Sequence, residues 1–95
     1  MNIKELHAKE KGVSAQQIFK GKLASATGIQ LQEDAVLKEH ATKTAALLLC
    51  ISGNVLYEDE TGEKIELVSG DYVNIIPNVI HWIKANSLSQ LILLK

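Results

Sequence analysis

The chain has 95 residues, of which 46% are apolar and only 4% aromatic, and its formal net charge is −1. This length corresponds to one domain, since domains typically span about 50–200 residues, and Val, Ile, Leu and Ala must fill most of its core. The weak net charge and a basic complement made only of lysines argue against binding to nucleic acid, to anionic membranes or to specific phosphate groups.

The N-terminal part differs from the rest of the chain. Residues 3–10 (IKELHAKE) could form one or two helical turns that end at Gly12, and so short a helix must dock elsewhere to persist. His7 has no partner in the pattern and is interpreted as an exposed helix residue. This charged start lacks an apolar signal segment, and the longest apolar run, residues 45–51, is far shorter than the ~20 residues that span a bilayer. We therefore expect a cytoplasmic protein without a membrane segment.

From Ile18 onward, short stretches rich in β-branched and apolar residues alternate with turn residues. This spacing is typical of a β-sandwich or small barrel. Gly53 and Gly62 stand where hairpin turns favour a left-handed residue. We predict a single all-β domain over residues 1–95, with an N-terminal segment at 1–17 and a β-barrel at 18–95. The expected strands include IFKGKLASAT, GIQLQ, AVLKEH, TAALLLCIS, NVLYED, EKIELV, DYVNII, HWIKA and SQLILLK.

The stretch KEHATKTAALLLCISG (residues 38–53) and the stretch GDYVNIIPNVIHWIKA (residues 70–85) resemble the two sequence motifs of the cupin superfamily. In the first motif, His40 and Gly53 match, whereas Lys38 replaces a histidine and Ala46 replaces a glutamate. The resemblance implies a double-stranded β-helix, also called a jelly-roll barrel, of the RmlC-like kind, with a short N-terminal helical segment.

In the second motif, Gly70 and His81 match the family pattern. Ile76 replaces a proline and Ala85 an asparagine, while Asn78 replaces a glycine, and asparagine tolerates the left-handed conformation better than most residues. Of the four metal ligands usual in the family, the motifs therefore supply only His40 and His81.

The implied site is a pocket at the barrel mouth. Because strand side chains alternate between faces, Lys38 is expected on the face of His40, and Ala46 on the face of Leu48 and Cys50. The predicted pocket residues are His40, His81, Lys38, Ala46, Leu48, Cys50 and Ile83.

Two histidines are fewer ligands than a metal usually takes, since metal sites usually have three or four protein ligands. A nearby lysine would also repel a divalent cation. A divalent transition metal (Zn, Ni, Fe or Mn) on His40 and His81 is one interpretation, and we favour no tightly bound metal. Two further interpretations stay open, namely a metal-free site for a small polar or anionic molecule, and two histidines that serve only structure.

Cys50 lies in the most apolar strand and is interpreted as a buried, inert cysteine. Leu47, Leu49 and Ile51 lie on the other face of that strand, which must also be covered, either by residues 3–19 or by a second subunit. Trp82 points away from the barrel if His81 points inward, and is a candidate interface anchor. The resemblance implies a homodimer. The acidic residues near 58–63 are interpreted as a solvated loop.

Three functions compete. We favour a small-molecule-binding or sensing domain whose ligand the sequence does not specify. The first alternative is a metal-dependent cupin enzyme, an oxygenase or isomerase, that uses His40 and His81. The second is a structural homodimer without a ligand. Whether the protein is an enzyme is left open.

Overall fold

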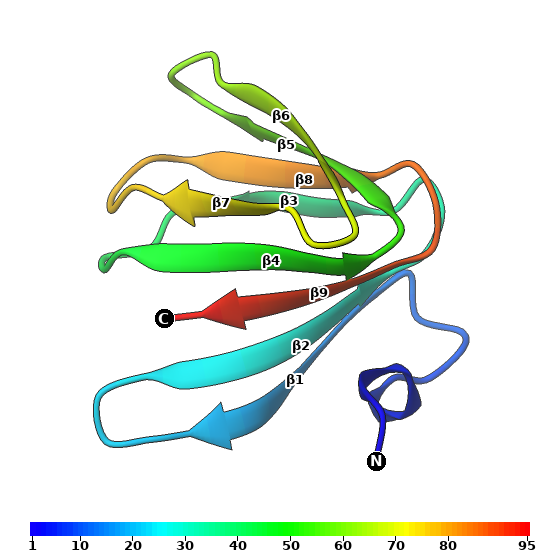
Figure 1. Cartoon of the computed structure of the whole chain (residues 1–95). Coiled ribbons are helices and arrows are strands. Elements are labelled where there is room, and N and C mark those ends of the chain that lie inside the picture. Colours follow the sequence, from blue (N-terminus) through cyan, green and yellow to red (C-terminus); the bar gives the residue numbers. More distant parts are fainter.

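The computed structural model describes the backbone of residues 1–95 and the side chains of residues 1–38 and 41–95. Two antiparallel sheets pack face to face (Figure 1). The five-stranded sheet has the order β1-β2-β9-β4-β7, and the four-stranded sheet has the order β3-β8-β5-β6. The elements are η1 (Ile3–Leu6, a 3-10 helix), β1 (Val13–Lys20), β2 (Ser25–Leu31), β3 (Val36–His40), β4 (Ala46–Ser52), β5 (Asn54–Asp59), β6 (Lys64–Val68), β7 (Tyr72–Ile75), β8 (His81–Ala85) and β9 (Ser89–Leu94).

This arrangement confirms the predicted all-β jelly-roll. Sequence neighbours such as β4 and β5 lie in different sheets, so the chain crosses repeatedly between the two layers. The C-terminal strand β9 lies in the middle of its sheet, between β2 and β4. Among the described residues, no helix is long and apolar enough to cross a membrane.

The core forms because the strands alternate with period two, which sends every second side chain between the sheets. In β4, Leu48 and Cys50 are buried, whereas Leu47 and Leu49 on the other face are only half-buried. Leu91 pairs with both Cys50 and Ile29 at the centre of the five-stranded sheet. Complete burial of one such leucine contributes about 1.5–3 kcal/mol. Apolar core residues from both sheets include Ile29, Leu31, Leu48, Val55, Leu67, Ile75, Ile83 and Leu91.

Three predicted turn positions are confirmed by their backbone angles. Gly53 and Gly62 both have φ of 95°, and Asn78, which follows the only proline, has φ of 64°. These angles lie in the left-handed region, where a side chain other than that of Asn or Asp is strained. The Pro77-Asn78 turn therefore reverses the chain between β7 and β8, and β8 begins at His81.

The N-terminal part needs three corrections. The helical segment is only the single turn η1, and β1 begins at Val13, before the expected start of the barrel at residue 18. Residues 13–17 are a strand because β2 offers them a complete antiparallel partner, with Val13 opposite Leu31. His7 is also not a free surface residue, since its Nδ1 lies 2.7 Å from the Ser14 hydroxyl oxygen.

Candidate functional site

A row of polar residues crosses the four-stranded sheet at one end of the barrel. The register places Asp59 of β5 opposite His81 of β8, and His81 opposite the backbone of His40 in β3. The side chain of His40 is outside the described residues. His81 is 1% exposed and Asp59 7% exposed, so both lie between the sheets. The predicted inward position of His81 agrees with this geometry.

The loops at this end are tied together by backbone hydrogen bonds. The amide of Asn78 donates to the carbonyl of Thr42 over 2.7 Å, and the amide of Glu60 donates to the carbonyl of Ile80 over 2.9 Å. The polar row therefore lies beneath a set of three joined loops, which precede β4, join β5 to β6 and precede β8.

His81 is fixed in one orientation by its neighbours. Its Nδ1 lies 3.2 Å from the carbonyl oxygen of Val79. A carbonyl can only accept, so Nδ1 carries a proton and donates this hydrogen bond. The ring stacks on that of Tyr57, with centroids 5.8 Å apart and planes inclined by 27°.

Asp59 is held by four donors. Its Oδ1 accepts from the amide of Thr61 (2.9 Å), the hydroxyl of Thr61 (2.5 Å) and the amide of Glu63 (3.3 Å). Its Oδ2 accepts from the hydroxyl of Tyr57 over 3.3 Å. The Thr61 hydroxyl is the main reason that the pKa of Asp59 lies below its ordinary value, because hydrogen bonds to a carboxylate favour the charged form. Asp59 is therefore an anion at neutral pH.

Tyr57 completes the cluster from the next inward position of β5, opposite Ile83. It is 2% exposed. Burial, followed by the charge of Asp59, raises the pKa of Tyr57 to about 12, since both disfavour a buried phenolate. The hydroxyl proton is donated to Oδ2 of Asp59, so the phenol oxygen retains its capacity to accept a hydrogen bond.

Stability should fall at alkaline pH because of Tyr57. Its pKa is raised from 10.0 to about 12 on folding, so its stabilising contribution is complete below pH 10 and is lost as the pH rises towards 12. We expect the free energy of unfolding, measured by urea denaturation, to decline less steeply in this range for Tyr57→Phe than for the wild type. The same change at the exposed Tyr72 should leave the decline intact, and equal slopes for wild type and Tyr57→Phe would contradict this assignment.

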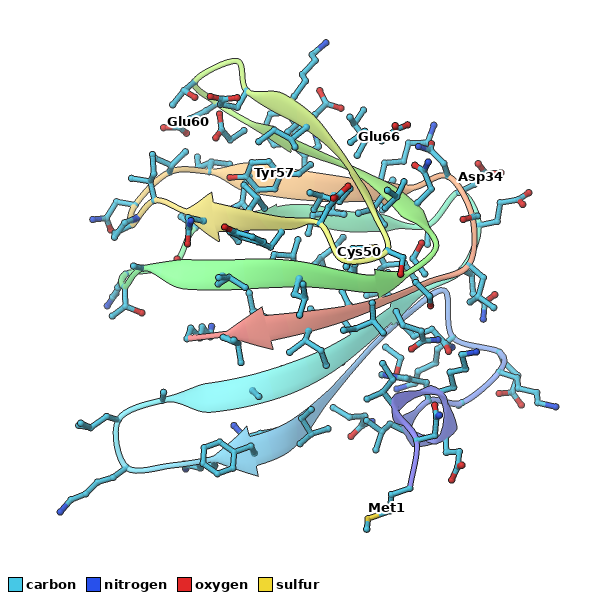
Figure 2. All side chains as sticks on the ribbon, in the orientation of Figure 1. Met1, Asp34, Cys50, Tyr57, Glu60 and Glu66 are labelled. Carbon is cyan, nitrogen blue, oxygen red and sulfur yellow. The ribbon has the colours of Figure 1, made fainter. Side chains whose placement is uncertain are left out.

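The predicted apolar pocket residues are all in the core. Ala46, Leu48, Cys50 and Ile83 are between 0% and 6% exposed. Glu60 lies at one end of the barrel, and Cys50 lies towards the other end (Figure 2). Burial, and secondarily the charge of Asp71, raises the pKa of its thiol, which favours the inert form. The side chain of Lys38 is exposed. That these residues line a ligand pocket stays a prediction.

The sequence analysis did not identify Tyr57 and Asp59 as site residues. It also predicted that the acidic hairpin is solvated throughout, whereas Asp59 is buried. The signal was present in the stretch NVLYED, where Val55, Tyr57 and Asp59 occupy every second position. A strand that buries Val55 and Tyr57 must also turn Asp59 inward. The charge of Asp59 hid this pattern, because carboxylates are rarely buried without a dedicated set of donors.

The described side chains do not complete a metal site. No group of three or more His, Cys, Asp or Glu side chains that could hold an ion occurs outside residues 39 and 40. Asp59 and His81 are two potential ligands, fewer than the three or four protein ligands of a usual metal site. We therefore derive no chemical step through a metal.

The predicted interface residues lie on two different sheets. Leu47, Leu49 and Ile51 are on the outer face of the five-stranded sheet, where Ile51 is 38% exposed. Trp82 is opposite Glu58 on the outer face of the four-stranded sheet. The two groups face away from each other across the sandwich, so they cannot contribute to one flat contact.

The fold matches those of several solved structures. A cupin superfamily protein from Desulfitobacterium hafniense superposes with a TM-score of 0.86 at 16% identity, over 98% of this chain and 84% of that one. An RmlC-like cupin from Shewanella frigidimarina gives 0.81 at 20% identity, over 92% and 78%. A cupin-2 domain protein from the same organism gives 0.80 at 14% identity, over 100% and 92%. No family model and no curated protein matches the sequence. These superpositions establish a shared fold.

Proposed function

We propose that this chain, which has the cupin fold, binds a small uncharged or cationic molecule that donates hydrogen bonds to the polar row at the barrel mouth. The observation that carries the proposal is the convergence of Tyr57, Asp59 and His81 in an otherwise apolar interior. Sites that combine apolar walls with a few oriented polar groups are typical of ligand binding.

The chemical class follows from the direction of the hydrogen bonds. Asp59 is ionised and can only accept. The proton of Tyr57 is directed to Asp59, and the proton of His81 is directed to Val79. Asp59 and Tyr57 therefore offer a carboxylate and a phenol oxygen, both of which accept hydrogen bonds. A hydroxyl-bearing or amine ligand complements them, whereas an oxyanion would be repelled by Asp59.

A thermal-shift screen tests this proposal with two compound sets, namely polyols, sugars and amines on one side, and phosphates and carboxylates on the other. A ligand that binds only the folded state stabilises it by about 2.7 kcal/mol at 100 times its Kd. We expect hits in the first set only. Hits confined to the anionic set would contradict the proposal.

The site is tested by a matched pair of substitutions in β5. Asp59→Asn removes the inward charge, whereas Glu58→Gln makes the same change on the outer face, opposite Trp82. The first should weaken binding of the identified hit at least about tenfold, because charge-assisted hydrogen bonds are among the strongest, and the second should not. Equal binding by Asp59→Asn would place the ligand elsewhere. A stoichiometric transition metal in purified protein, lost in His81→Ala, would instead support the metal-dependent enzyme.

We also propose that two copies associate through the outer face of the five-stranded sheet. The register aligns Phe19, Ala26, Leu94 and Leu47 in one row across four strands. Phe19 is 61% and Leu94 is 42% exposed. The chain exposes 5961 Å², whereas a monomer of its mass exposes about 5,400 Å². The row of Phe19, Ala26, Leu94 and Leu47 is apolar and uncharged, which suits a two-fold contact in which the same patch meets itself.

A further inference from the structure

We infer that the N-terminal segment, residues 1–11, is a clamp on the five-stranded sheet that opens when the imidazole of His7 takes up a proton. Four features of the described residues support this inference. They are the hydrogen bond between His7 and Ser14, two buried polar atoms without partners, the close approach of Leu6 to Gly28, and a groove between the segment and β1. It is independent of the proposed ligand.

The hydrogen bond joins the segment to the sheet. Nδ1 of His7 lies 2.7 Å from the hydroxyl oxygen of Ser14 in β1, and Ser14 is 3% exposed. A second, weaker tie follows downstream, where the side-chain amide of Gln32 donates to the carbonyl of Lys9 over 3.3 Å. His7 is thus the anchor at the end of η1, and the chain between it and β1 is held more loosely.

Gly28 of β2 provides the seat. A Cβ atom at this position would lie 3.2 Å from Cδ1 of Leu6 and 3.8 Å from Nε2 of His7. The first distance is shorter than ordinary van der Waals contact, so the absence of a side chain at residue 28 is what allows Leu6 and His7 to approach the sheet. Backbone contact of this kind is a common reason for glycine within a strand.

The surroundings of His7 do not accommodate a positive charge. Its Nε2 is buried without a hydrogen-bond partner, as is Oε1 of Gln90. Gln30 and Gln90 are buried on the same outer face as Gly28, and are bonded to each other over 2.7 Å. His7 lies against Ser14 and Gly28. The described residues that neighbour these two on the same face of β1, β2 and β9 are Gln16, Gln30, Gln90 and Ile92, none of which is charged. The nearest charged residues of its own segment, Lys4, Glu5, Lys9 and Glu10, are exposed.

The direction of the pH effect follows. Burial lowers the pKa of His7 from its ordinary value of 6.5, because the docked position disfavours the imidazolium. The contribution of His7 to docking is therefore complete above pH 6.5 and is lost as the pH falls through the lowered pKa. The released segment, with its imidazolium in water, no longer covers Gly28.

Opening also removes a surface feature. A groove of about 420 Å³ lies between the segment and β1. Met1, Asn2, Ile3 and Leu6 form one wall, and Gln17 and Ile18 form the other. Because the first wall consists entirely of the clamp, the groove exists only while the clamp is docked.

The test is a proton NMR titration of the full chain. We expect the His7 imidazole to titrate below the histidine reference of ~6.5, and the Overhauser cross-peaks between the Leu6 methyls and the Gly28 α-protons to disappear with the same midpoint. Titration of His7 at or above the reference, or cross-peaks that persist after His7 has titrated, would overturn the inference.

Gly28→Ala is the decisive variant. The new Cβ would press on Cδ1 of Leu6, so it should weaken the cross-peaks between Leu6 and residue 28 and move the midpoint of the His7 titration towards the reference value. Gly12→Ala is the control, since a Cβ at residue 12 would meet only Ala35 at 4.0 Å, and it should behave as the wild type. Amide exchange in β4 and β9 reports whether the barrel is folded in each variant. A folded Gly28→Ala protein with an unchanged His7 titration would also overturn the clamp.

Discussion

Gly53→Ala should be among the most destabilising single changes in this chain, lowering the free energy of unfolding by about 2–6 kcal/mol. A side chain at φ of 95° is strained, at a cost of roughly 1–3 kcal/mol. The new Cβ would also lie 2.5 Å from the carbonyl oxygen of Leu88 and 2.7 Å from Cα of Ser89. These are backbone atoms that cannot rotate away, and overpacking adds about 1–3 kcal/mol.

Gly62→Ala separates the two causes. Gly62 has the same φ of 95°, but no atom lies within 4 Å of a Cβ built there. It should therefore show the conformational strain alone, at about 1–3 kcal/mol. Urea denaturation of both variants measures the difference. If the two substitutions cost the same, the close approach between the β4–β5 turn and the start of β9 would not be a determinant of stability.

Leu49→Glu should weaken self-association at least about 100-fold, if the proposed dimer uses the outer face of the five-stranded sheet. Leu49 pairs with Ile92 and Tyr72, so it lies on the apolar face and away from its edges. A carboxylate buried there would have no partner in either copy, and the two-fold symmetry introduces it twice. Loss of about 2.7 kcal/mol corresponds to a 100-fold rise in Kd. Sedimentation equilibrium gives the dimer Kd of each variant.

Leu56→Glu is the matched control on the other sheet. Leu56 is half-buried on the outer face of β5, between Lys84 and Glu66, on the side that carries Trp82. It should leave the Kd unchanged. Dissociation by Leu56→Glu, with an intact dimer in Leu49→Glu, would transfer the interface to the face of Trp82. A monomeric wild type at high concentration would remove the dimer proposal altogether.

Only part of the candidate site could be predicted from the sequence. His81 was predicted as a site residue because it follows a turn and occupies a motif position. The left-handed backbone of Asn78 in that turn and the burial of His81 agree with the prediction. Asp59 was not found, although it is directly opposite His81. The difference is physical, since a histidine after a tight turn is a local feature, whereas burial of a carboxylate depends on donors from Thr61, Glu63 and Tyr57 that only the folded hairpin brings together.

The sequence by itself determined the all-β class, most of the strands and the glycine and asparagine turns, because period-two alternation and left-handed residues act over a few neighbouring positions. It could not determine that Val13 begins a strand, since that depends on pairing with Leu31. Nor could it determine that Trp82 and Leu47 lie on opposite faces of the sandwich, or that Leu6 and His7 dock on Gly28. These relations join residues far apart in the chain, and only the packing of the two sheets decides which of them meet.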